Sequence, residues 1–133
     1  MNFSIGDRVT RTRRIGDQEV SLFAELVGDY NSIHFSDDAA RAAGFQGRIA
    51  HGMIASSMLS EILGTELPGP GSVYLSQTLS FRAPILIPSE VTLDVEITAV
   101  REEKNIYTLS TTCTLADGTV CIAGEALILK RKI

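Results

Sequence analysis

The chain has 133 residues, of which 44% are hydrophobic and 21% are charged, and its formal net charge is -4. This size fits a single globular domain over residues 1–133 and leaves no room for a second one. The acidic balance argues against nucleic-acid binding, and because no stretch resembles a signal peptide or reaches the ~18 apolar residues of a membrane span, we expect a cytoplasmic protein without a membrane partner.

The start of the chain predicts a strand followed by a helix. The strand is expected near residues 8–14, and the helix is expected to begin at Gly16 and Asp17 and to end at Gly28. The apolar positions of the helix repeat as they do on one helical face, at Val20, Phe23, Ala24 and Val27. This pattern is typical of an amphipathic helix lying on a core.

Two further helices are predicted before the middle of the chain. Ser36 is a favourable N-cap for a short helix that stops at Gly44. The next helix, residues 52–63, has Glu61 as its only charged residue. Its apolar side chains lie nearly all round it: Met53, Ile54, Ala55, Met58, Leu59, Ile62 and Leu63. Because this helix has no clear polar face, we expect the rest of the chain to wrap around it.

The second half of the chain predicts strands. Apolar and polar residues alternate in four segments, residues 72–82, 91–100, 106–115 and 120–129. Turn residues at 102–105 and 117–118 separate the last three segments, and the proline-containing stretch 84–88 suits an edge or a crossing connection. In the second segment one face should lie on the core, with Val91, Leu93, Val95, Ile97 and Ala99 pointing inward.

Helices in one half and strands in the other predict an α+β fold rather than an alternating one. A bent antiparallel sheet wrapped around a buried central helix is the hot-dog architecture, and we expect that fold here. A small sheet of this kind has exposed edges, and pairing across a two-fold axis is a common way to cover them. A homodimer is therefore expected.

Cysteine and histidine usage predicts neither a disulfide nor a metal site. Cys113 and Cys121 fall in strand segments on either side of a turn, and their register cannot be fixed from the sequence. Because cytosolic thiols stay reduced, we interpret both as small core residues. The only histidines, His34 and His51, stand in no metal-ligand motif, so no metal is expected.

The segment Gly28-Asp29-Tyr30-Asn31-Ser32-Ile33-His34 is the first candidate for chemistry. A turn between two helices can aim Asp29 and His34 at one point, where a carboxylate and an imidazole would supply acid–base chemistry. Asn31 offers both a donor and an acceptor and could orient the pair. An equally simple interpretation is that Asp29 and Asn31 serve the backbone of the turn and that His34 is a hydrogen-bonded, half-buried side chain.

A second candidate is the start of the apolar helix, Ala50-His51-Gly52-Met53. A helix N-terminus offers unpaired N–H groups, and Gly52 has no side chain to block an approaching oxygen, so its N–H could stabilise a developing oxyanion. Gly52 could instead only permit close packing. We interpret His51 as a structural residue that hydrogen-bonds the loop rather than as a second catalytic base.

These two segments resemble the MaoC-like family of (R)-specific enoyl-CoA hydratases. The signature of that family is approximately a small residue followed by G-D-x-N-P-(I/L/V)-H, five further residues and another small residue. In this chain, residues 28–34 and Ala40 match it, and His51-Gly52-Met53 matches the H-G-M at the start of the central helix. The similarity continues through residues 71–75 and 79–81 and so covers most of the chain. Val27 replaces the usual small residue, and Ser32 replaces the usual proline. The loss of the proline frees the turn and could loosen the geometry between Asp29 and His34.

The resemblance implies reversible hydration of a trans-2-enoyl-CoA thioester to the (3R)-3-hydroxyacyl-CoA thioester, without a cofactor. It implies that Asp29 is the general base, that His34 assists as a proton donor, and that the N–H of Gly52 polarises the thioester carbonyl. Ser60 and Leu63 are candidates for the wall of the acyl-chain pocket, although ordinary core packing would account for them as well.

Several points stay open at the level of sequence. Arg48, Arg82 and Lys104 could meet the phosphates of CoA, but exposed cations are usually only solvated. A 3-hydroxyacyl-[acyl-carrier-protein] dehydratase, a non-catalytic acyl-CoA-binding protein and a hot-dog thioesterase are the competing functions, since a fold alone does not determine function. Chain length and pathway are not predicted.

Overall fold

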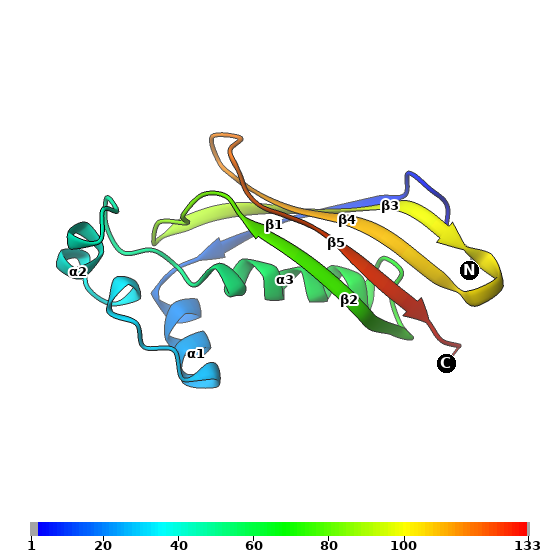
Figure 1. The fold of residues 1–133 in the computed structure, drawn as a ribbon, viewed down its shortest axis with the longest axis horizontal. Helices are drawn as coiled ribbons and strands as arrows, with labels where there is room; N and C mark the ends of the chain where they lie inside the picture. The colour runs from blue at the N-terminus through cyan, green and yellow to red at the C-terminus, as the bar shows by residue number, and fades with distance from the viewer. Residues whose placement is uncertain (1–2, 133) are drawn as a thin grey trace.

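A five-stranded antiparallel sheet curves over one long helix in the computed structural model, which describes residues 3–132 (Figure 1). The strands are β1 (Arg8–Ile15), β2 (Ser72–Phe81), β3 (Ser89–Arg101), β4 (Ile106–Leu115) and β5 (Val120–Lys130). The helices are α1 (Asp17–Val27), α2 (Asp37–Ala42) and α3 (Gly52–Thr65), and two single turns of 3-10 helix, η1 (Ser32–His34) and η2 (Glu102–Lys104), lie between elements. The order of strands in the sheet is β1-β3-β4-β5-β2. This arrangement confirms the predicted hot-dog fold.

The core lies between the concave face of the sheet and α3. The side of α3 that faces the sheet is buried, and its buried residues are Ile54, Ala55, Ser56, Leu59, Ile62 and Leu63. Inward-facing residues of β3, β4 and β5 complete the core, among them Val95, Leu109 and Ile128, each at most 1% exposed. Because α3 carries so much apolar surface, its burial is a large part of what stabilises the fold.

The prediction that α3 is covered on nearly all sides is wrong for this chain. Met53 is 49% exposed, and Ser57, Ser60, Glu61 and Gly64 continue the same exposed stripe along the helix. Three of these five residues are serine or glycine, which are small. No other segment of the described chain therefore has to cover this stripe. The hydropathy of the helix is the same whether this side is buried within the chain or is a surface that a second molecule covers, so the sequence does not separate the two cases.

The strand registers explain one further difference from prediction. Val91, Leu93, Val95 and Ile97 point into the core as predicted, whereas Ala99 is exposed. The pairing of β3 with β4 shifts between Ile97 and Ala99, and one extra residue in a strand reverses which side the following residues face. Val100, instead of Ala99, packs against the core.

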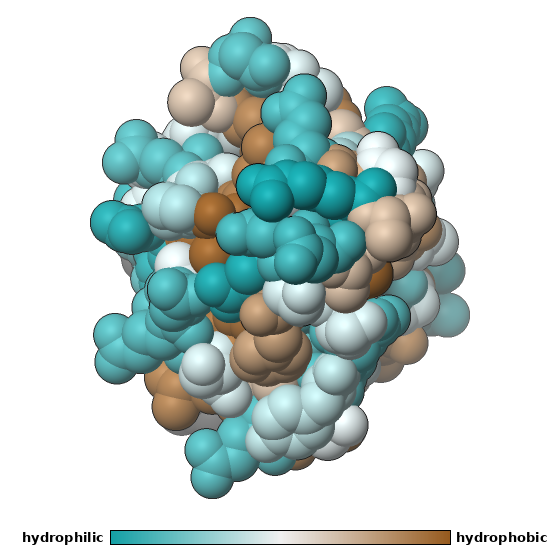
Figure 2. Space-filling view, turned by 90° about the vertical axis from the view of Figure 1, so that its left-hand side faces the viewer, coloured by the Kyte–Doolittle hydropathy of each residue, from teal (hydrophilic) through white to brown (hydrophobic). Residues whose placement is uncertain are grey.

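The short helices gather at one end of the sheet. α1 buries Val20 and Ala24, but Val27, predicted to lie on the same apolar face, is 53% exposed at the last turn before Gly28. Gly28 closes the helix with a φ of 80°, a conformation that favours glycine. α2 begins at Ser36, whose hydroxyl accepts the N–H of Ala39, as predicted. Figure 2 looks onto this end and shows apolar patches between hydrophilic side chains.

Cys113 and Cys121 are buried free thiols, as predicted. They are not direct cross-strand partners, because Cys113 pairs with Ile122 and the register shifts beside it. The Cys121 thiol donates to the carbonyl of Cys113 at 3.2 Å. The hydrogen bond with the Cys121 thiol, together with burial, raises the pKa of Cys113. Among the helices of the described residues, none has both the length and the apolar character to cross a bilayer.

Candidate active site

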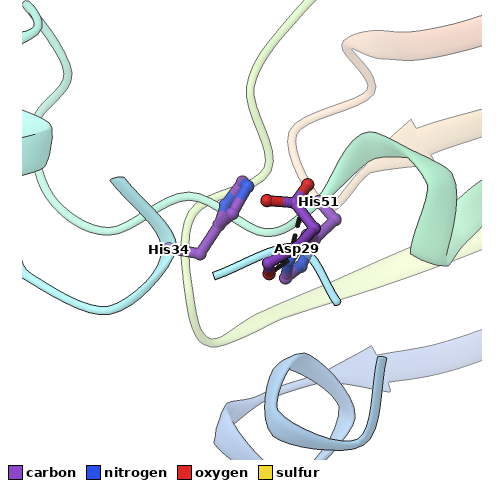
Figure 3. A group of neighbouring side chains, drawn as sticks. All are labelled: Asp29, His34 and His51. Carbon is purple, nitrogen blue, oxygen red and sulfur yellow. Dashed lines mark hydrogen bonds and ion pairs between the residues drawn. The ribbon is translucent and has the colours of Figure 1, made fainter. Parts of the chain in front are cut away.

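Asp29, His34 and His51 meet between the short helices and the start of α3 (Figure 3). One polar atom from each side chain lies within 4.8 Å of those of the other two. Asp29 comes from the segment after α1, His34 from η1, and His51 is the residue just before α3. The turn thus brings together the two residues that the sequence predicts as an acid–base pair, and adds the second histidine to them.

The local fold of this turn comes from side chains bonding to nearby backbone. Oδ1 of Asp29 accepts the N–H of Asn31 at 3.1 Å, and Oδ1 of Asn31 accepts the N–H of Ile33 at 3.3 Å. Asn31 is thereby the N-cap of η1, which carries His34. The interpretation that Asp29 and Asn31 hydrogen-bond to the backbone of the turn is therefore confirmed. It does not exclude chemistry, because the Asp29 side chain remains 48% exposed.

One ring nitrogen of His34, Nδ1, is hydrogen-bonded to a backbone carbonyl, and the other, Nε2, has no such partner in the described part of the chain. Its side chain is 6% exposed, and Nδ1 lies 2.6 Å from the carbonyl oxygen of Ile49. A carbonyl only accepts, so Nδ1 carries a proton, and neutral His34 then has its lone pair on Nε2. No hydrogen bond to Nε2 is found within residues 3–132. His34 therefore presents a nitrogen with a lone pair that can accept a hydrogen bond or a proton.

His51 anchors the turn, as predicted. Its Nε2 lies 2.9 Å from the carbonyl oxygen of Asp29 and 3.9 Å from Oδ2 of the same residue. Its ring is 3% exposed and stacks on the ring of His34, with centroids 3.7 Å apart. Sequence reasoning missed this stacking, since a separation of 17 residues between two histidines gives no signal that their rings will touch.

Gly52 is the first residue of α3, so its N–H has no acceptor within the helix. Within residues 3–132 no other acceptor is hydrogen-bonded to it. A Cβ at this position would lie 2.7 Å from the ring of Phe81, so the packing interpretation of Gly52 is correct, and the N–H is available as well. Gly52 and Phe81 border a cavity of about 470 Å³ that is mostly apolar.

Ser60 and Leu63 do not share one cavity. Ser60 borders a second cavity, of about 630 Å³, between α3 and β2, together with Ser56, Tyr74 and Gln77. Leu63 is 1% exposed and belongs to the core cluster. The prediction that both residues line one wall is therefore corrected. Ser60 faces the cavity between α3 and β2, whereas Leu63, three positions further along α3, points into the core.

Asp29, His34 and His51 are also residue types that bind metal ions, and one polar atom of each lies within 4.8 Å of those of the other two. Nδ1 of His34 and Nε2 of His51 already donate to main-chain carbonyls, so each ring has one nitrogen left for another contact. The expectation that no metal is bound therefore stays a prediction.

Arg48, one of the three candidate cations, is occupied by structural contacts. Its side chain, 23% exposed, donates to the carbonyl of His34 at 2.8 Å and pairs with Asp17 at 2.7 Å. Arg82 borders the cavity beside Gly52. Lys104 lies in η2, in the hairpin between β3 and β4, at the end of the sheet away from α2 (Figure 1). Arg82 is thus the candidate that stands near the site.

The two departures from the family signature are harmless in this structure. Val27 is 53% exposed at the end of α1, so about half of its surface faces solvent. Ser32 is the first residue of η1, a position that tolerates many residues, and the turn keeps its shape through the caps of Asp29 and Asn31. Ala40, the matching small residue, is fully buried.

Comparison with known proteins gives one consistent family. Residues 3–118 match the model described as "MaoC like domain". A curated (R)-specific enoyl-CoA hydratase of Aeromonas caviae is 40% identical over 96% of this chain and 95% of its own, and one of Rhodospirillum rubrum is 42% identical over 93% and 85%. The solved structure titled as the (R)-hydratase from A. caviae involved in PHA biosynthesis superimposes with a TM-score of 0.93, at 40% identity, over 97% of this chain and 98% of the other.

Proposed function

The chain belongs to the MaoC-like domain family, and we propose that it is an (R)-specific enoyl-CoA hydratase, a hydro-lyase that adds water reversibly to trans-2-enoyl-CoA to give (3R)-3-hydroxyacyl-CoA. The observation that carries the proposal is the meeting of Asp29 and His34 beside the N-terminus of α3. A base, a proton carrier and an unpaired N–H are the three groups that hydration of a thioester-conjugated double bond requires.

Asp29 is the general base in this proposal. Its half-exposed carboxylate accepts a proton from a water molecule held between it and Nε2 of His34, and the water oxygen bonds to C3 of the substrate. The π electrons of the C2–C3 bond shift toward the thioester carbonyl, which becomes an enolate. The proton that Asp29 took from water passes to Nε2 of His34, which donates it to C2, so both side chains return to their starting state and no cofactor is consumed.

The N–H of Gly52 receives the enolate charge. It stands at the first position of α3, where the helix dipole favours negative charge and no helical acceptor competes for it. One such donor lowers a barrier by about 3 kcal/mol when it is placed in advance. Asn31 acts indirectly, because its side chain caps η1 and so orients His34 rather than touching the substrate.

The two cavities suggest where the substrate lies. The cavity that Gly52 and Phe81 border reaches Arg82, which we propose contacts the CoA moiety at its rim. The cavity between α3 and β2, which Ser60 borders, is a suitable place for the acyl chain. Ser56 and Ser57 donate their hydroxyls to helix carbonyls, so they present little unpaired polarity to an alkyl group.

We also propose that the protein is a homodimer that pairs through β2. The two edges of the sheet differ in character. β1 carries Arg8, Arg11 and Arg13, which form ion pairs with Asp94, Glu66 and Glu61. β2 instead exposes Val73, Tyr74 and Leu75 by 42–47%. Charged residues protect an edge against pairing, whereas an apolar edge favours it.

One assay separates the candidate functions. The protein is incubated with crotonyl-CoA, and the loss of enoyl absorbance, the configuration of the 3-hydroxybutyryl-CoA product and the release of free CoA are measured. Hydration with an R product supports the proposal. Release of thiol indicates a thioesterase, no reaction despite binding indicates a non-catalytic acyl-CoA binder, and a strong preference for crotonyl-acyl-carrier-protein indicates a carrier-protein dehydratase.

A further inference from the structure

His51 connects the two halves of the site. It is the N-cap residue of α3, directly before Gly52, and its Nε2–H donates to the carbonyl of Asp29 at 2.9 Å. A single hydrogen bond therefore joins the segment that carries the proposed base to the backbone that carries the proposed oxyanion donor.

The hydrogen bond to the Asp29 carbonyl is the main polar contact of the His51 ring. Nδ1 is buried and has no hydrogen-bond partner within the described residues, so nothing there would accept a second proton. The groups that face the ring are Phe23 of α1 at 5.0 Å, the stacked ring of His34, and the Asp29 carboxylate with Oδ2 at 3.9 Å. Because the side chain is 3% exposed, substrate and bulk water have little access to it.

We propose, on the basis of the hydratase function above, that His51 is a positioning residue for the reaction. Its Nε2–H holds the Asp29 peptide at a fixed distance from the N–H of Gly52. His51 neither receives nor donates a proton during turnover. Its effect is on how well the base and the oxyanion donor reach the same substrate, and a misplacement of about 1 Å can cost about 100-fold in rate.

The test compares variants that differ in the donor at this position. His51→Gln places an amide N–H near the position of Nε2, whereas His51→Met has similar length without a donor, and His51→Phe keeps a ring without a donor. Leu109→Val, in the core strand β4, is the control for lost stability, since Leu109 is fully buried and takes no part in the site. Steady-state kinetics on crotonyl-CoA and thermal unfolding are measured for each variant.

We expect His51→Phe and His51→Met to lower kcat about 30-fold with KM changed by less than about threefold, because the ground-state complex still forms while the transition state is poorly aligned. His51→Gln should recover most of that loss, and the melting temperature should not follow kcat across the series. Equal kcat for Gln and Met overturns the proposal, as does a loss that only parallels unfolding, with Leu109→Val losing kcat to the same degree.

A double-variant cycle identifies the residue through which His51 acts. In the Asp29→Asn background, His51→Met should lower kcat by less than about threefold, since the base that it positions is already absent and residues acting as a unit are not additive. A full and independent loss in that background overturns the proposal. A parent protein that does not hydrate crotonyl-CoA, or an Asp29→Asn variant with parental kcat, instead refutes the proposed function itself.

Discussion

At the scale of single residues, the sequence predicts which residues gather at the candidate site better than it predicts the contacts that hold them there. Asp29, His34 and Gly52 could be selected as candidates because their residue types and spacing match a known signature. The anchor of His34 on the carbonyl of Ile49 could not, because backbone acceptors have no sequence signal. The same holds for the stacking of His34 on His51, which arises only when the chain returns from α2 to α3.

The acid–base pair can be tested with variants that preserve the turn. Asp29→Asn keeps Oδ1, which accepts the N–H of Asn31, and removes the charge. His34→Asn keeps a donor toward Ile49 and lacks Nε2, and His34→Ala removes both. We expect each variant to lower kcat on crotonyl-CoA by at least about 100-fold while the melting curve of the Asn variants stays close to that of the parent. Turnover near the parental value in a folded variant would contradict the assignment.

Gly52 and Gly64 form a matched pair on one helix. A Cβ at Gly52 would meet Phe81 at 2.7 Å, whereas a Cβ at Gly64 meets nothing within 4 Å. We therefore expect Gly52→Ala to displace Phe81 or the start of α3. Alanine keeps the N–H, but a displaced donor loses much of a contribution of about 3 kcal/mol, so kcat should fall at least about 30-fold. Gly64→Ala should raise the free energy of unfolding by up to about 1 kcal/mol and leave kcat unchanged. Equal kinetics of the two variants would show that the start of α3 takes no part in catalysis.

At the scale of elements, the predicted helices and strands agree closely with the structure, and the errors have local causes. All four strands of the second half begin and end within about two residues of their predicted bounds, the usual uncertainty of such boundaries. The alternation predicts the wrong face for Ala99 because a bulge after Ile97 interrupts it. The hydropathy of α3 overstates its burial, because small residues such as Ser57 and Gly64 do not mark an exposed side.

Leu63 and Ser60 test which side of α3 meets the acyl chain. Leu63 is 1% exposed in the core, so Leu63→Ala should lower the free energy of unfolding by about 2–5 kcal/mol without extending activity to longer substrates. Ser60→Phe should fill part of the cavity between α3 and β2 and raise KM for eight-carbon enoyl-CoA more than for crotonyl-CoA. Denaturant unfolding and kinetics on both substrates check this. Activity of Leu63→Ala on eight-carbon substrates at the level of crotonyl-CoA would place the acyl chain in the core instead.

At the scale of the whole molecule, the sequence predicts the architecture because helices and strands are segregated and one helix carries only a single charged residue, Glu61. It does not predict which edge of the sheet is left for a partner, since that depends on the strand order. Only the order β1-β3-β4-β5-β2 shows that the arginine-rich strand and the apolar strand β2 are the two edges. Strands β3, β4 and β5 lie between β1 and β2, so these two form opposite edges of the sheet.

A charge placed on β2 should separate the dimer. Leu75 is 47% exposed on this edge, and Leu75→Glu would bury a carboxylate in the proposed interface, so we expect a monomer by sedimentation velocity and a reduced kcat. Ile5→Glu is the control, because Ile5 is 67% exposed just before β1, beside the opposite edge. A parent that sediments as a monomer, or a Leu75→Glu variant that still dimerises, would exclude β2 as the contact.

The anchors of both histidines are main-chain oxygens, those of Ile49 for His34 and of Asp29 for His51. A peptide oxygen persists whatever side chain the residue bears, so the identity of residue 49 is largely uncoupled from the geometry of catalysis. Ile49 also borders the cavity beside Gly52. That position can consequently drift during evolution, or be randomised in a directed-evolution library, to reshape substrate preference while the reaction itself is retained.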